Sequence, residues 1–119
     1  MAQVVPIDKS GYSLARMRYE IILTPQAVED LNALRADLRA AVRQALETHL
    51  RFEPTKTSKS RIKRLRGLSK PQYGLRVDEI RVFYDVTGDR VEILAIVPKS
   101  AADDWLRKAG EPDETDPTI

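Results

Sequence analysis

The spacing of apolar residues changes three times along the chain, and these changes predict the order of its helices and strands. Residues 18–23 are rich in β-branched and aromatic side chains, which is typical of a strand. Between Pro25 and Pro54, apolar residues recur three and four positions apart, which predicts helix. Thr24 is the expected N-cap, because Pro25 suits the first helical position. Asp37 is a plausible second N-cap, so we expect an antiparallel helical hairpin that ends at Pro54.

The second half of the chain has the alternation and the turn residues of an antiparallel sheet. The predicted strands cover residues 61–66, 73–77, 80–86 and 91–97. Ser100 is expected to cap a short C-terminal helix that continues through Arg107. The order predicts an α+β fold: an N-terminal strand, a helical hairpin, a three- to four-stranded mainly antiparallel sheet and a short last helix.

Length and composition indicate one small domain. The chain has 119 residues, and we expect an N-terminal extension at 1–17, one domain at 18–109 and an acidic C-terminal tail at 110–119. Because there is no cysteine, disulfides, thiolate nucleophiles and Cys-based zinc sites are excluded. No apolar run approaches the ~20 residues that cross a bilayer, and no secretory signal is recognisable. We expect a cytoplasmic protein with no membrane partner and no cofactor.

The formal net charge of +2 hides a strong asymmetry along the chain. Residues 51–81 have a formal charge of +7, and residues 101–119 have a formal charge of −4. Seven cations without a single acid follow one another in the first of these stretches: Lys56, Lys59, Arg61, Lys63, Arg64, Arg66 and Lys70. This run favours a polyanionic partner such as a nucleic acid. The alternative is a solvated edge strand that carries cations to prevent aggregation.

Arg76 and Arg81 flank the predicted turn at 78–79, so a hairpin would place them on neighbouring strands. Lys99, at the end of the next strand, could join them near the same end of the sheet. Three converging cations suit a pentacoordinate phosphate, whose extra negative charge they would stabilise. From spacing alone, an equally good interpretation is that the two arginines pair with Asp78, Glu79 or the acidic tail.

Two further residues have a structural and a functional interpretation each. His49 is the lone histidine, which argues against a metal site and favours a partly buried helix residue over a general base. Trp105 is either an anchor that covers the sheet or a platform on which a nucleic-acid base stacks.

Three stretches of the chain resemble the RelE/ParE toxin superfamily. They are Leu65 to Gly67, Tyr73 to Tyr84 and Ile93 to Lys99, and the resemblance extends over roughly residues 18–108. It implies the toxin of a type II toxin–antitoxin pair, with the fold expected above. RelE-like members are implied to cleave messenger RNA in the ribosomal A site without a metal and to be silenced by a cognate antitoxin. The ParE side of the superfamily implies a DNA gyrase inhibitor without the catalytic cations, and a non-catalytic nucleic-acid-binding module remains a third possibility.

The resemblance also implies roles for individual residues. Arg76 and Arg81 match two catalytic cations, and Lys99 matches a third. Trp105 stands where RelE-like members have a catalytic tyrosine, and Gly74 stands where they have another basic residue. The implied reaction is attack of a ribose 2′-hydroxyl on the adjacent phosphate. In this scheme Lys99 is the titratable group, because arginine keeps its proton, and Trp105 stacks on a base.

Overall fold

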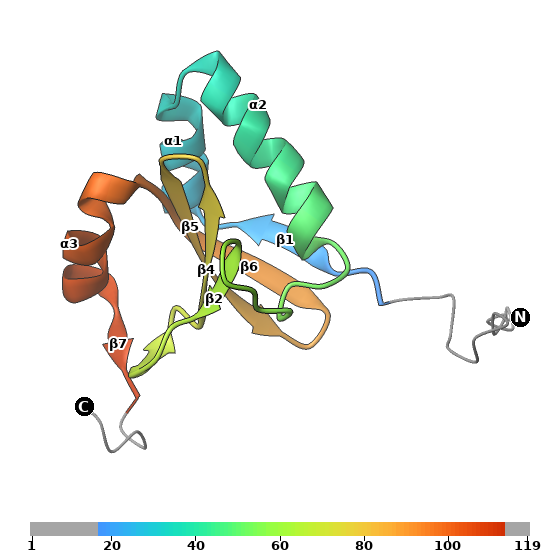
Figure 1. Cartoon of the computed structure of the whole chain (residues 1–119), viewed down its shortest axis with the longest axis vertical. Coiled ribbons are helices and arrows are strands. Elements are labelled where there is room, and N and C mark those ends of the chain that lie inside the picture. The colour runs from blue at the N-terminus through green and yellow to red at the C-terminus, as the bar shows by residue number, and fades with distance from the viewer. Residues whose placement is uncertain (1–16, 114–119) are drawn as a thin grey trace, which may run out of the picture.

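The computed structural model describes residues 17–113, and it confirms the predicted α+β class. Figure 1 shows the helices α1 (Pro25–Ala33), α2 (Ala36–Ala45) and α3 (Lys99–Ala109). A π-helical turn, η1 (Leu46–Leu50), directly follows α2. The strands are β1 (Glu20–Leu23), β2 (Ile62–Arg64), β3 (Leu68–Lys70), β4 (Tyr73–Val77), β5 (Ile80–Thr87), β6 (Arg90–Pro98) and β7 (Glu111–Pro112). Within this part of the chain, no helix is long and apolar enough to cross a membrane.

Five strands form the main sheet in the order β1-β6-β5-β4-β2. β1 lies at one edge and runs parallel to β6, and all other neighbouring pairs are antiparallel. β2 is the opposite edge. Its outward-facing backbone is partly covered by the chain itself, because Ser58 donates its N–H to the Ile62 carbonyl at 2.9 Å. This backbone contact protects the edge strand from pairing with another sheet, and it involves no charged side chain.

β3 and β7 form a separate two-stranded ribbon. The first residues of the predicted acidic tail are therefore attached to the domain, and Asp113 donates its N–H to the Gly67 carbonyl at 3.0 Å. The rest of that tail (114–119) and most of the predicted N-terminal extension (1–16) lie outside the described residues.

The first helix begins as predicted, and the starts of the other two differ from the prediction. The hydroxyl of Thr24 accepts the N–H of Ala27 at 3.1 Å, so Thr24 is the N-cap of α1. Asp37 is not an N-cap: α2 begins one residue earlier, and the Asp37 carboxylate accepts hydrogen bonds from Arg35 instead. Ser100 is not a cap either, because α3 begins at Lys99 directly after β6.

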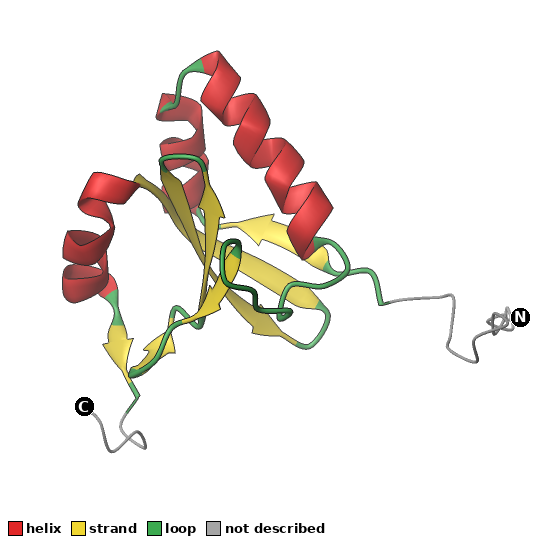
Figure 2. Cartoon of the chain, viewed as in Figure 1, coloured by secondary structure: helices red, strands yellow, loops and turns green. Residues whose placement is uncertain are grey.

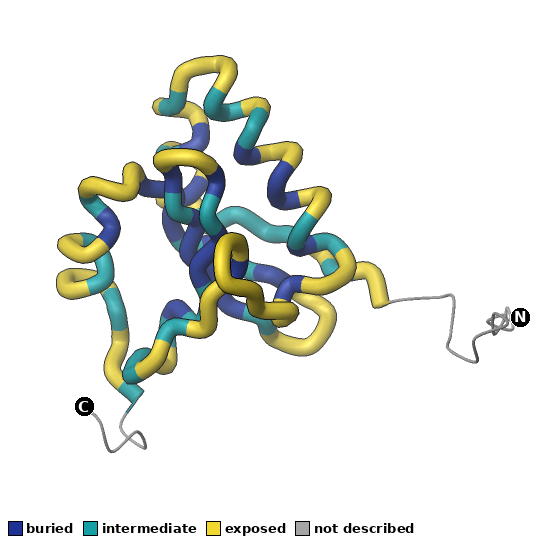
Figure 3. Tube along the Cα trace, viewed as in Figure 1, coloured by how far each residue is buried: buried dark blue, intermediate teal, exposed yellow. Residues whose placement is uncertain are grey.

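The two faces of the sheet are covered by different helices (Figure 2). The face toward α1 and α2 carries the main core, whose sheet residues include Leu75, Val77, Ile80, Val82, Tyr84, Val91 and Ile93. Figure 3 shows the buried positions concentrated in the sheet and on the sides of the helices that face it. A smaller cluster on the other face consists of Phe83, Ala95, Val97 and Ala102, with Leu65, Trp105 and Leu106 packed against it.

Tyr84 ties the loop after η1 to the main core. Its side chain is fully buried, and its hydroxyl donates a hydrogen bond of 2.6 Å to the carbonyl of Pro54, which is buried as well. The ring of Tyr73 stacks on it with 5.4 Å between centroids. Burial raises the pKa of the Tyr84 phenol, which therefore remains a donor at neutral pH.

We expect Tyr84→Phe to lower the free energy of unfolding by about 1–3 kcal/mol, because the buried Pro54 carbonyl loses its partner. Urea unfolding followed by circular dichroism measures this change. Tyr73→Phe is the matched control and should be close to neutral. Equal stability losses in the two variants would contradict a special role for the Tyr84 hydroxyl.

Candidate nucleic-acid interface

A groove of about 210 Å³ lies on the face of the sheet that carries α3. It is lined by Lys63, Leu65, Gly74, Arg76, Arg81, Phe83, Ala102, Asp103 and Leu106. The strand residues share this face because side chains alternate along a strand. Their neighbours Leu75, Val77 and Val82 point into the main core, so Arg76 and Arg81 are forced to the other side.

The register of the hairpin places Arg76 directly opposite Arg81. Both arginines are half-buried, and no carboxylate of residues 17–113 forms an ion pair with either. Neither arginine therefore forms the expected ion pair with Asp78 or Glu79, and residues 114–119 of the acidic tail, the other expected partner, lie outside the described residues. Arg81 donates instead to the backbone carbonyls of Asp78 and Ile80, each at 3.0 Å, which holds its guanidinium near the turn.

Lys63 is the third cation of the groove, and it lies opposite a residue without a side chain. Its Cα partner across β2 and β4 is Gly74, the position at which the resemblance implies another basic residue. Lys63 thus lines the groove beside Gly74, which has no side chain. Sequence analysis assigned Lys63 to the basic run but did not foresee this position, since the register of β2 against β4 follows from no local pattern.

Phe83 is the one aromatic residue among the described lining residues of the groove, and Trp105 packs on it. Phe83 is the Cα partner of Gly74, and a β-carbon placed on Gly74 would lie 3.4 Å from the Phe83 ring, in ordinary contact. On its other side Phe83 stacks on Trp105, with 5.2 Å between centroids and 8° between planes. Trp105 therefore covers the sheet, in agreement with its interpretation as an anchor, and Phe83 takes up one face of its ring.

The helix contributes a carboxylate that sequence analysis missed. Asp103 lines the groove from α3, together with its helix neighbours Ala102 and Leu106. The available signal was its position four residues after Lys99, which places both on the same side of a helix. Lys99 itself is exposed and is not one of the lining residues. It begins α3 and donates its backbone N–H to the Glu79 carbonyl at 2.6 Å.

Two of the remaining predicted RNA-binding cations are held by the protein. The guanidinium of Arg64 lies over the ring of Tyr73 at 5.4 Å and donates to two backbone carbonyls. The ammonium of Lys70 lies 4.0 Å from a carboxylate oxygen of Asp85 and 4.0 Å from one of Glu92. The Asp85 carboxyl is nearly buried, and burial raises its pKa.

The other four cations are distributed around the β2 edge. Lys56 lies 3.9 Å from Glu53, Lys59 is exposed, Arg66 lines a small pocket with Asp113, and Arg61 faces the end of α2. The basic run is thus not one continuous surface. Among residues 17–113, no group of three or more His, Cys, Asp and Glu side chains could hold a metal ion.

The sequence matches a known family over most of the described domain. The model of the family described as "ParE toxin of type II toxin-antitoxin system, parDE" matches residues 21–103. No curated protein matches the chain.

Solved structures of toxins have a similar fold. RelE in the archaeal RelE–RelB complex from Pyrococcus horikoshii is 24% identical with a TM-score of 0.58, over 70% of this chain and 97% of that one. The RelBE2 complex from Mycobacterium tuberculosis contains a chain that is 25% identical with a TM-score of 0.54, over 68% and 98%. A mutant of the E. coli toxin RelE in the free state is 17% identical with a TM-score of 0.58, over 78% and 99%.

These matches agree with the resemblance noted in the sequence and with the fold derived from it. The family match covers the strand and helices of the first half, the whole antiparallel sheet and the start of α3. The chain belongs to the ParE toxin family of type II toxin–antitoxin systems, within the RelE/ParE superfamily.

Proposed function

We propose that this toxin is a ribosome-dependent endoribonuclease, which cuts messenger RNA in the ribosomal A site and so stops translation. The groove between the sheet and α3 binds the RNA backbone. The proposal rests on one observation above all, the opposition of Arg76 and Arg81 across β4 and β5. Like charges directly opposite one another in a sheet are destabilising. A phosphate group bound between the two guanidinium groups turns this repulsion into attraction.

Cleavage in this proposal is an attack of the ribose 2′-oxygen on the adjacent phosphorus. The bond from the 2′-oxygen to phosphorus forms, and the bond from phosphorus to the 5′-oxygen breaks. Arg76 and Arg81 stabilise the charge of the pentacoordinate phosphate. Asp103, the one carboxylate among the described lining residues, accepts the 2′-hydroxyl proton, and Lys63 donates a proton to the leaving 5′-oxygen. Arginine serves neither step, because its guanidinium does not lose its proton in proteins.

Lys99 and Trp105 contact the RNA in this proposal but take no part in proton transfer. Lys99 stands at the first turn of α3, where its exposed ammonium contacts a phosphate next to the one that is cut. Trp105 stacks an RNA base on the ring face that Phe83 leaves uncovered. The resemblance assigned proton transfer to Lys99. In this proposal Asp103 and Lys63, which line the groove, transfer the protons instead.

The partner that silences such a toxin is a cognate antitoxin. Several of the similar structures are named as complexes with RelB or YefM antitoxins. For this chain we propose an antitoxin with an acidic segment that covers the groove, since the cations of the groove have no carboxylate partners among the described residues.

A second candidate is inhibition of DNA gyrase without RNA cleavage. The stack of Phe83 on Trp105 favours it, because Trp105 stands where RelE-like members are implied to have a proton-transferring tyrosine and is packed against the sheet. Supercoiling assays with purified gyrase distinguish this candidate from the endoribonuclease.

Replacing either groove arginine should abolish most of the cleavage. We expect Arg76→Gln and Arg81→Gln each to slow message cleavage about 100-fold, because each removes one donor to the pentacoordinate phosphate. Primer extension on ribosome-bound message measures the rate. Arg90→Gln is the control, since Arg90 lies at the far end of β6 and pairs with Glu20. Unchanged cleavage in both groove variants would contradict the assignment.

Asp103 and Asp104 are adjacent acids on α3 with different surroundings, which makes a matched pair of variants. Asp103→Asn should slow cleavage about 100-fold through loss of the proton acceptor, whereas RNA affinity should rise because a repelling charge is removed. Asp104→Asn should leave both unchanged, as Asp104 pairs with Arg107 and Lys108 outside the groove. Faster or unchanged cleavage by Asp103→Asn would exclude Asp103 as the base.

Gly74→Arg tests whether a further cation can be added to the groove. A β-carbon at Gly74 meets the Phe83 ring at 3.4 Å, so the variant should fold. We expect tighter RNA binding and a steeper dependence of affinity on salt, by about one additional released counterion. Gly74→Gln is the control of similar shape without charge. Equal affinities and salt slopes in the two variants would show that RNA does not contact this position.

A further inference from the structure

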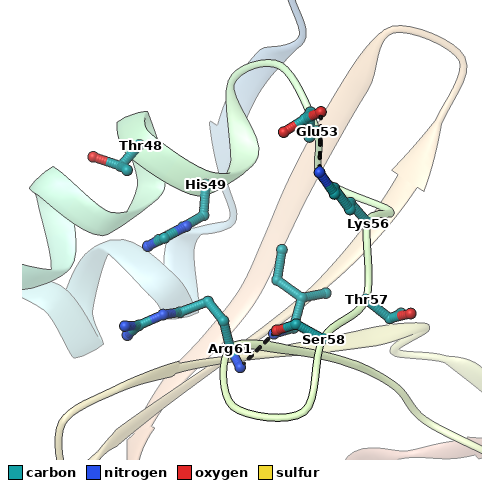
Figure 4. Close-up of a pocket in the computed structure, with 8 residues that line it drawn as sticks. Thr48, His49, Glu53, Lys56, Thr57, Ser58 and Arg61 are labelled. Carbon is teal, nitrogen blue, oxygen red and sulfur yellow. Dashed lines mark hydrogen bonds and ion pairs between the residues drawn. The ribbon is translucent and has the colours of Figure 1, made fainter.

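A second pocket, of about 190 Å³, lies between η1 and the loop that leads into β2 (Figure 4). It is lined by Thr48, His49, Glu53, Lys56, Thr57, Ser58, Arg61 and Ile62. None of these residues lines the groove on the α3 side. A wider depression along α2 adjoins it and shares Thr48, His49 and Arg61. This pocket has no part in the proposed cleavage.

The pocket is rich in hydrogen-bond donors. The cations Lys56 and Arg61, the imidazole of His49 and the hydroxyl of Ser58 line a volume that suits a phosphate group, whereas Figure 4 shows the hydroxyls of Thr48 and Thr57 directed away from it. The single carboxylate of the pocket, Glu53, is already engaged by Lys56 at 3.9 Å. Figure 4 shows His49 and Arg61 extending in the same direction from facing elements, the helix and the loop.

The guanidinium of Arg61 has N–H donors that are available to a ligand. One nitrogen of its guanidinium donates to the Arg76 carbonyl at 3.0 Å, which anchors the side chain beside β4. No carboxylate of residues 17–113 forms an ion pair with it. The loop that carries it is fixed as well, because the hydroxyl of Ser58 accepts the Arg61 N–H at 2.9 Å. A guanidinium held in this way is preorganised for a bidentate contact with an anion.

The local fold brings His49 to this place. The chain widens from α-helix to π-helix at Leu46–Leu50, and such π-turns are frequent at functional sites. Burial lowers the pKa of His49, and the positive charge of Arg61 lowers it further. The charged groups around the imidazole are Arg61, Lys56 and Glu53 in the pocket, and Asp37 and Asp78 in the adjoining depression.

We propose that the His49–Arg61 pocket binds a phosphate group of a nucleic-acid backbone, as a second contact separate from the groove. The two positions lie on either side of β2, the edge strand, so that one nucleic-acid strand can pass over this edge and reach both. This arrangement also assigns a binding role to several cations of the basic run. Lys63 serves the groove, and Lys56 and Arg61 serve the pocket. Lys59, which lies between Lys56 and Arg61 along the chain, is exposed.

The chain has one histidine, so His49 reports on the pocket without ambiguity. We suggest NMR titration of the imidazole in the full chain with inorganic phosphate and with a short single-stranded DNA. The DNA has no 2′-hydroxyl and cannot be cut by the proposed reaction, so binding is tested independently of cleavage. Both ligands should shift the imidazole signals and raise the His49 pKa. Affinity for DNA should therefore rise as the pH falls through the titration of His49.

Variants locate the contact. Arg61→Gln, and Lys56→Gln as a second variant, should weaken DNA binding at His49 about tenfold through loss of a charged hydrogen bond. Arg43→Gln, on the exposed side of α2, should leave the response of His49 intact. If both pocket variants respond like the wild-type chain, or if neither ligand shifts His49, the proposal fails. A response to inorganic phosphate alone would overturn the nucleic-acid assignment in favour of free phosphate.

Discussion

The two-residue turn at Asp78 and Glu79 sets the strand register that places the core residues on one face of the sheet and the groove arginines on the other. Asp78 adopts the left-handed backbone conformation, with φ of 54°, which a tight hairpin of this kind requires. The turn fixes β4 against β5, so that Val77 pairs with Ile80 and Arg76 pairs with Arg81. A slip of one residue would exchange the faces of every side chain on one strand and would bring arginine into the core. The stability of the domain and the charge of the groove are thus set by one register.

This register divides the sheet into a face that carries the main core and a face that carries the groove. The helical hairpin covers the first face with a continuous hydrophobic core, and Tyr84 fastens the loop at Pro54 to it. The second face is covered only in part, by α3 and by the stack of Phe83 on Trp105. The uncovered remainder is the groove. Because the main core supplies the stability, the second face can tolerate two opposed arginines whose repulsion costs free energy until an anion binds.

The sequence predicted the fold class, the cap at Thr24 and the meeting of Arg76 with Arg81, because each follows from residues close together in the chain. Contacts between segments that are far apart in the chain were predicted less well. The place of Lys63 depends on the pairing of β2 with β4, and β3 lies between them along the chain. The division of the basic run between two sides of β2 was hidden for the same reason. The separation of Lys99 from the groove follows from the start of α3 directly after β6, where a cap at Ser100 was expected.

The central claim is that the groove arginines stabilise the attack of a 2′-oxygen on its adjacent phosphate, and the chemistry of the cut ends tests it most directly. Purified toxin should be added to ribosomes that hold a defined message, and the termini of the fragments should be identified by mass spectrometry. Cleavage by this route leaves a 2′,3′-cyclic phosphate on one fragment and a free 5′-hydroxyl on the other, and both should form about 100-fold more slowly with Arg76→Gln. Fragments with 5′-phosphates, or an intact message together with inhibited gyrase supercoiling, would contradict it.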